Sequence, residues 1–214
     1  MIRLKAKAVA EFMTANALEQ RKILHAYKYP DDPGNTPRIQ YYREARTAIR
    51  DFYKQRRPAT WLTARAQHVR SRVASGPSGA TRLENNAQAI EHFAQHFSRE
   101  RLLYQGSLSM SLRICRIQVD ATPDLYVMRL QREKLISTEF ATGLSSQEHA
   151  ARFRIVGHMM FEAASRKGMG VTRSDVVCYE VATGKKHRIT ASGVRVMKQL
   201  NAACQNIEGI WPTL

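Results

Sequence analysis

Two acidic residues lie on consecutive predicted strands, where they could share a metal ion. Asp124 follows Pro123 at the start of one strand, and Glu139 lies near the end of the next. Carboxylate oxygens are the ligands that Mg²⁺ prefers, at about 2.0–2.1 Å, and such a site leaves positions open for water and phosphate. The alternative is structural: Asp124 caps a turn after Pro123, and Glu139 faces solvent on an edge strand.

The arrangement of these residues resembles the motif of the PD-(D/E)xK nuclease superfamily, which includes RecB-like and Cas4-like exonucleases and many restriction endonucleases. The motif is Pro-Asp, then (D/E)xK on the next strand, then a helix and a further strand, and the resemblance covers roughly residues 86 to 181. It implies that Asp124 and Glu139 are catalytic residues that bind Mg²⁺. It also implies an acidic residue from an upstream helix in the metal site, and Glu91 is the candidate.

The chain departs from this motif at its lysine, because Ala141 stands in that place. Side chains alternate along a strand, so Ala141 shares a face with Glu139 but cannot supply a cation there. Arg152 or Lys134 could supply one, although Lys134 lies on the opposite face of the strand from Glu139. Two functions therefore stay open: a nuclease-like subunit that does not cleave, which Ala141 favours, and an active Mg²⁺-dependent nuclease.

The charge of the chain points to a polyanionic partner. Its 214 residues contain 34 Lys and Arg against 18 Asp and Glu, a formal net charge of +16. Residues 1–116 carry +12 of that charge (21 basic, 9 acidic) and residues 117–214 carry +4 (13 basic, 9 acidic). Nucleic acid is the commonest polyanion that such a field meets, with anionic lipid as the competitor.

Basic residues are densest between residues 38 and 72. Nine of the ten are Arg, whose planar guanidinium matches phosphate oxygens two at a time. We expect a nucleic-acid-binding surface, against the alternative of a solvated helix face. Its predicted residues are Arg38, Arg43, Arg46, Arg50, Lys54, Arg56, Arg57, Arg65, Arg70 and Arg72. Tyr42 and neighbouring aromatic residues could stack on bases, but the apolar stripe that includes Tyr42 favours a place in the core.

Apolar spacing predicts that the first hundred residues are all helical. One or two amphipathic helices fit residues 6–28, with a break at 14–16, and Thr36-Pro37 would begin the next helix. The later helices are expected over residues 37–57, 60–74 and 83–97.

Near residue 106 the apolar period changes from helical to alternating. Strands are expected over 107–119, with a bulge near Cys115 or Arg116, and then over 125–130 and 134–140 as an antiparallel meander. A helix follows, beginning with a capping box of Ser145 and Glu148 and ending at Gly168. Two short strands, at 175–181 and 187–190, precede a final helix.

This order of elements predicts an α/β fold: a PD-(D/E)xK-like mixed sheet (β-β-β-α-β) with a parallel pair, preceded by a basic helical region. We expect the helical region over 1–105 and the core with its C-terminal helix over 106–214. The absence of an apolar run of about 20 residues and of an export signal predicts a cytoplasmic protein without a membrane partner. Nucleic acid is the expected partner, DNA rather than RNA from the resemblance alone, within a DNA-processing or phage-defence assembly.

Overall fold

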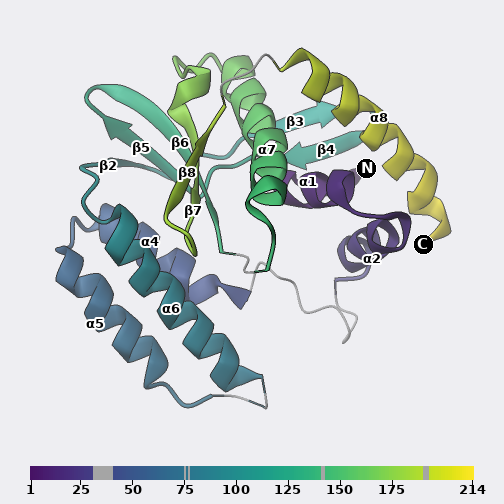
Figure 1. The fold of residues 1–214 in the computed structure, drawn as a ribbon. Coiled ribbons are helices and arrows are strands. Elements are labelled where there is room, and N and C mark those ends of the chain that lie inside the picture. Colours follow the sequence, from purple (N-terminus) through teal and green to yellow (C-terminus); the bar gives the residue numbers. More distant parts are fainter. Residues whose placement is uncertain (31–40, 75, 77, 141–142, 190–192) are drawn as a thin grey trace.

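The computed structural model describes residues 1–30, 41–74, 76, 78–140, 143–189 and 193–214. It confirms a mixed α/β fold, with helices on both faces of a central sheet (Figure 1). The strands are β1 (Ile2–Lys5), β2 (Leu103–Gly106), β3 (Ser111–Ile114), β4 (Ile117–Asp120), β5 (Leu125–Arg129), β6 (Arg132–Glu139), β7 (Val176–Glu180) and β8 (Lys185–Arg188). The helices are α1 (Ala6–Thr14), α2 (Ala17–Lys28), α4 (Arg43–Lys54), α5 (Ala59–Arg70), α6 (Gly79–Phe97), α7 (Ser146–Arg166) and α8 (Val194–Ile210).

The central sheet has five strands in the order β2-β5-β6-β7-β8. β5 and β6 form an antiparallel hairpin, while β6 and β7 are parallel, with Leu135 opposite Val176 and Glu139 opposite Glu180. A parallel pair requires a crossover connection, and α7 provides it. The predicted mixed sheet with a parallel pair is therefore present.

Each face of this sheet buries a different hydrophobic cluster. Leu135 and Cys178 face the cluster that includes α1, α7 and α8, whereas Ile136 and Tyr179 face the cluster formed with α4, α5 and α6. Because both faces are covered, the central strands carry apolar side chains on both faces instead of alternating between apolar and polar residues. On β6 the alternation places Glu139 on the same face as Leu135, toward α1 and α7.

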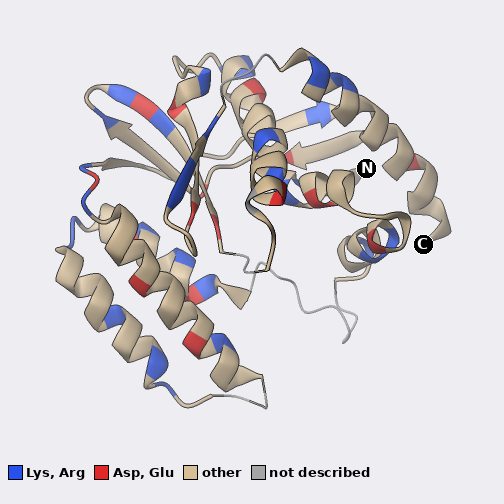
Figure 2. Ribbon diagram, viewed as in Figure 1, with Lys and Arg blue, Asp and Glu red and all other residues tan. Residues whose placement is uncertain are grey.

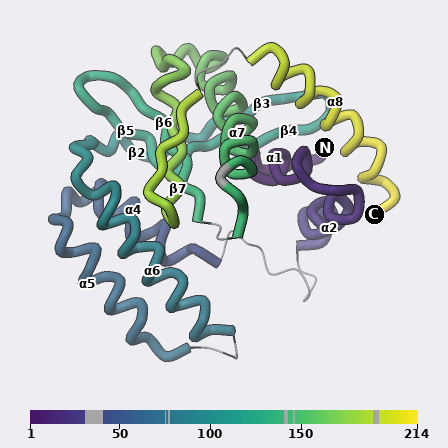
Figure 3. The backbone as a smooth tube through the Cα atoms, in the orientation of Figure 1, coloured from purple at the N-terminus to yellow at the C-terminus, as the bar shows by residue number. Residues whose placement is uncertain are grey.

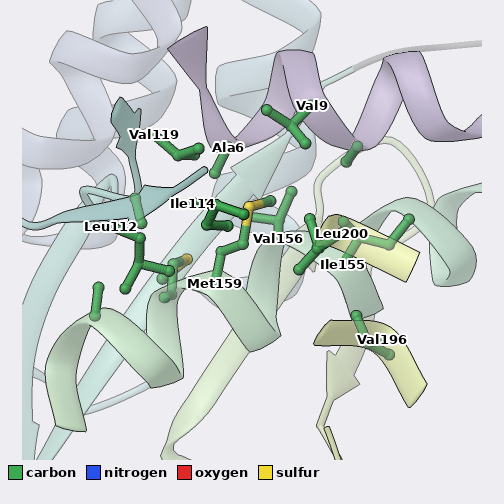
Figure 4. Close-up of a cluster of buried hydrophobic side chains, with 14 of the residues drawn as sticks. Ala6, Val9, Leu112, Ile114, Val119, Ile155, Val156, Met159, Val196 and Leu200 are labelled. Carbon is green, nitrogen blue, oxygen red and sulfur yellow. The ribbon is translucent and has the colours of Figure 1, made fainter. Parts of the chain in front are cut away.

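A second, three-stranded sheet has the order β1-β4-β3, with β1 parallel to β4. The prediction that the first hundred residues are all helical is wrong at β1. The predicted bulge is also wrong, because β3 and β4 form an antiparallel hairpin whose turn holds Cys115 at a φ of 52°. Apolar side chains of this sheet pack against α1, α7 and α8. Figure 4 shows Leu112 of β3 and Val119 of β4 in one cluster with Val156 of α7.

The division of the chain at residues 105/106 does not follow the packing. The smooth trace in Figure 3 shows α1 and α2 beside α7 and α8, on the other side of the central sheet from α4–α6. Of the described helices in the predicted helical region, α4, α5 and α6 form a separate layer, whereas α1 and α2 do not belong to it. The predicted N-cap at Thr36-Pro37 lies outside the described residues.

Local signals at α7 are confirmed. Ser145 and Glu148 form the capping box, in which the hydroxyl of Ser145 accepts a hydrogen bond from the Glu148 backbone N–H. Gly168 follows the helix at a φ of 74°, a left-handed conformation that suits glycine. None of the helices in the described part of the chain is long and apolar enough to cross a membrane.

Candidate functional site

Asp124 lies immediately before β5 and is bound by groups from β6 and from α1. Its Oδ2 accepts hydrogen bonds from the Thr138 backbone N–H at 2.7 Å and the Thr138 hydroxyl at 3.0 Å. The ammonium of Lys7, on α1, donates to the same oxygen at 2.9 Å and to the carbonyl oxygen of Thr138 at 2.7 Å. Lys7 thus connects α1, by an ion pair and a hydrogen bond, to Asp124 before β5 and to Thr138 on β6.

The surroundings of Asp124 favour its ionised form. Burial by itself would raise the pKa of this carboxyl, but the positive charges of Lys7 and Arg46 and the hydrogen bonds from Thr138 and Lys7 lower it to about 2. Asp124 is therefore a carboxylate at neutral pH, neutralised by two cations from helices that lie on opposite faces of the sheet.

Glu139 lies at the end of β6 and its side chain lines a pocket of about 430 Å³ beside Lys7. Its Oε1 accepts a hydrogen bond from the backbone N–H of Phe140 at 3.0 Å. Lys7 thus forms an ion pair with Asp124 and lines the same pocket as Glu139. The residues that line this pocket are Lys7, Ala10, Glu11, Ser137, Glu139, His149, Arg152, Phe153, Val156, Cys178, Glu180 and His187.

The lining of the pocket also includes a buried acid and an imidazole. Glu180 on β7 lies 2.7 Å from Nε2 of His187 on β8. Burial would raise the pKa of Glu180, and hydrogen bonds from His187 and Thr183 lower it below its usual value. Arg152 on α7 lies 3.7 Å from Glu11 on α1, so the pocket lining also contains paired charges.

Glu91 does not join the acid pair. It lies on α6, where both of its oxygens accept hydrogen bonds from the guanidinium of Arg70 at 2.9 and 3.0 Å. Among the residues that the structure describes, no three His, Cys, Asp or Glu side chains are placed to hold one metal ion. The described residues thus do not form the predicted site of Glu91, Asp124 and Glu139.

The sequence did not reveal Lys7 as a site residue. It lies 117 residues from Asp124 in the chain, and its only signal is a basic residue four positions before Glu11 on an amphipathic helix. Of the two cations considered, Arg152 lines the pocket, whereas Lys134 lies 3.9 Å from Asp175. Ala141 lies outside the described residues.

Three of the predicted nucleic-acid-binding arginines are held in ion pairs between helices. Arg70 forms a pair with Glu84 as well as Glu91, and Arg65 and Arg72 both pair with Glu44. These arginines neutralise acidic residues of α4 and α6, which weakens the prediction that all ten basic residues serve one surface.

Other predicted residues form an exposed stripe on α4. Arg43, Arg50 and Lys54 are exposed and follow one another at intervals of seven and four residues, so they share a helix face. We call these three residues the α4 stripe; Figure 2 shows basic residues along this helix. Arg56 and Arg57 are exposed just beyond it, Arg57 with its guanidinium 6.0 Å from the Trp61 ring. Arg38 lies outside the described residues.

Arg46 connects the α4 stripe to the acidic site. It is half-buried at one edge of the same helix face, and its guanidinium carbon lies 5.5 Å from the centre of the Phe140 ring. Its charge also lowers the pKa of Asp124. Basic residues therefore extend from the exposed α4 stripe, through Arg46, toward the carboxylate of Asp124.

No protein-family model matches the chain, and no curated protein matches its sequence. What can be inferred about its function must come from its own residues.

Proposed function

We propose that the chain is a nucleic-acid-binding protein with a PD-(D/E)xK-like core that grips the phosphate backbone without cleaving it. One observation carries this proposal: the ammonium of Lys7 lies 2.9 Å from the carboxylate oxygen of Asp124 that also accepts from Thr138. The ammonium of Lys7 thus occupies the Asp124 oxygen that, by the resemblance, would have to be free to bind a metal ion.

The order of elements supports the nuclease-like part of the proposal. The resemblance implies Asp on one strand, Glu on the next, then a helix and a further strand. The chain has Asp124 before β5, Glu139 at the end of β6, α7 as the crossover and β7 parallel to β6. These positions agree with the resemblance at the level of secondary structure and strand pairing.

The donor set fits Mg²⁺ poorly as it stands. Oδ2 of Asp124 already accepts from Lys7 and from two groups of Thr138, and Glu139 accepts from its own following backbone N–H. A divalent ion would have to displace the Lys7 ammonium or lie against its positive charge, and like charges at such distances repel. We therefore assign no step of a reaction to a metal ion.

Phosphate binding needs only the cations that the chain itself provides. The α4 stripe presents Arg43, Arg50 and Lys54 to solvent, and each cation that reaches a phosphate releases condensed counterions from the nucleic acid. DNA is preferred over RNA because of the resemblance. The same resemblance suggests that the chain acts within a larger DNA-processing or phage-defence assembly.

A second function is favoured by the position of Lys7. The motif lysine, which Ala141 replaces in this chain, would lie beside the acid pair. Lys7, on α1, is a lysine that lies beside Asp124. In that case the chain is a Mg²⁺-dependent DNA nuclease in which Asp124 and Glu139 are catalytic.

Binding and cleavage of linear duplex DNA, single-stranded DNA and RNA in Mg²⁺ or Mn²⁺ separate these functions. We expect the purified chain to bind and to leave all three substrates intact. Cleavage that Asp124→Ala and Glu139→Ala both abolish, while the surface variant Glu162→Ala retains it, would establish the nuclease instead. Loss of one well-placed electrostatic group in such a site costs about 10²–10³ in rate, so Lys7→Ala would then lower cleavage by that factor.

A further inference from the structure

A second pocket, of about 330 Å³, lies on the opposite face of the sheet from the pocket of Glu139. It lies between α4, α6 and the segment after β7, and its lining combines aromatic, amide and imidazole side chains with small apolar ones. The lining residues are Tyr42, Asn85, Gln88, Ala89, His92, Phe140, Val181 and Ala182.

We propose that this pocket binds an unpaired nucleobase of the nucleic acid whose phosphates the α4 stripe holds; the inference rests on the proposed function and adds a base site to it. Tyr42 and Phe140 line the pocket as a stacked pair, with ring centres 5.1 Å apart and planes at 17°. Phe140 is itself buried against Tyr42 and the Arg46 guanidinium, so the half-buried Tyr42 is the ring that can stack on a base. Such a ring accepts any base, because every base has a π-face.

The rest of the lining can hydrogen-bond to the edge of a base. The amide of Asn85 donates to the Tyr41 hydroxyl at 2.7 Å, which leaves its carbonyl oxygen as an acceptor. Nδ1 of His92 lies 3.2 Å from the carbonyl oxygen of Ala182 and must be the donor, so Nε2 of the neutral ring is an acceptor. Gln88 is exposed and donates to Glu84 through one N–H, and its second N–H and its carbonyl oxygen are available to a ligand.

Arg46 supplies the link between a base and its phosphate. Phe140, which lines the pocket, lies under the guanidinium of Arg46, and Arg43 and Arg50 stand on the same helix face. A nucleotide needs an aromatic wall for its base and cations beside it for its phosphate. Both are present here, with Ala89 and Val181 as apolar lining that favours a base over a sugar.

The test compares a short single-stranded DNA with an abasic strand of the same length at one salt concentration, by fluorescence anisotropy. We expect wild type to bind the strand with bases about 5- to 150-fold more tightly, the range for stacking of one base. Tyr42→Ala should remove that preference, and Tyr42→Phe should keep it because the ring remains. Gln88→Ala should lower affinity for the strand with bases about fivefold, whereas Gln95→Ala, exposed on the same helix but outside the pocket, should not change it.

The outcomes separate this inference from the proposed function. If both strands bind equally well with the usual dependence on salt, or if Tyr42→Ala retains the preference with a wild-type circular dichroism spectrum, the base site is overturned and phosphate binding stands. The exposed Gln88 and Gln95 variants decide the point if Tyr42→Ala fails to fold: equal affinities for both variants overturn the base site. If no strand binds at low salt, the proposed function fails and the base site fails with it.

Discussion

The ammonium nitrogen of Lys7 lies 2.9 Å from Oδ2 of Asp124, across 117 residues of sequence and between two different layers of the fold. Lys7 is on α1 and Asp124 precedes β5, so the contact exists only when α1 is packed against the central sheet. The side chains are 29% and 25% exposed, which makes this ion pair less screened by water than the surface pairs of α5 and α6.

The Lys7–Asp124 pair should make stability depend on pH in the acid range. The pKa of Asp124 falls from its ordinary 3.8 to about 2 on folding, so the stabilisation is complete above pH 3.8 and is lost as pH falls through about 2. The shift corresponds to about 2 kcal/mol. Denaturant unfolding of wild type and Asp124→Asn between pH 5 and pH 2 should show wild type losing about that much more free energy of unfolding.

Removal of the cation should make this acid loss of stability smaller. In Lys7→Met the carboxylate of Asp124 loses the neighbouring positive charge, so its folded-state pKa rises toward the ordinary 3.8, and the variant should lose less free energy of unfolding between pH 5 and pH 2 than wild type does. Lys22→Met is the matched control, because Lys22 is 62% exposed and pairs only with Glu19 on its own helix. Identical acid transitions in Lys7→Met and Lys22→Met would contradict the electrostatic role of Lys7.

The basic residues of the helical layer should divide into two classes. Arg43→Ala, Arg50→Ala and Lys54→Ala together remove exposed cations of the α4 stripe, so the slope of log K against log salt on duplex should become shallower by up to about 2.7, at about 0.9 per phosphate contact. Arg65→Ala, Arg70→Ala and Arg72→Ala remove the same charge, but those arginines pair with Glu44, Glu84 and Glu91 of other helices at 2.6–3.7 Å. Within the stripe, Arg50 makes a longer contact, of 3.8 Å, with Asp51 of its own helix. We expect the second triple variant to change the slope much less; equal changes would show that the ion pairs do not withhold these arginines from the phosphates.

Two glycines in helices should respond to alanine in opposite ways. At Gly157 on α7 a Cβ would lie 2.9 Å from Cγ1 of the buried Ile189, whereas at Gly209 on α8 it would meet no atom within 4 Å. Overpacking costs about 1–3 kcal/mol, and replacing a helical glycine by alanine gains about 1 kcal/mol. Thermal unfolding should therefore show Gly209→Ala more stable than wild type and Gly157→Ala less stable. A stabilised Gly157→Ala would show that Ile189 can move aside at little cost.

Local patterns in the sequence predicted most elements but not which of them pair. The capping box of Ser145 and Glu148 and the strand expected over 134–140 depend on neighbouring residues, and the structure has both, the strand as β6. β1 is four residues long with only Leu4 fully buried, a pattern too short to distinguish from the start of a helix. The phase change at Cys115 was interpreted as a bulge, because a bulge and a two-residue turn shift the apolar alternation in the same way.

The candidate site was predictable only where it follows the order of strands. Asp124 precedes β5 and Glu139 ends β6. Because these strands form an antiparallel hairpin, both acids lie at the same end of it. The partner of Asp124 depends on how α1 packs, which no spacing reveals. Glu91 was chosen from its place upstream on a helix, and the sequence could not show that Arg70 on α5 would bind it.

The most direct test of nucleic-acid binding is the affinity of wild type for a labelled duplex, measured by fluorescence anisotropy as salt rises from low to moderate concentration. We predict binding at low salt and a linear fall of log K with log salt, with a slope of about −0.9 for each phosphate contacted. If each of the three residues of the α4 stripe contacts a phosphate, the magnitude of that slope is at least about 2.7. An affinity that does not change with salt, or the absence of binding at low salt, would contradict the account.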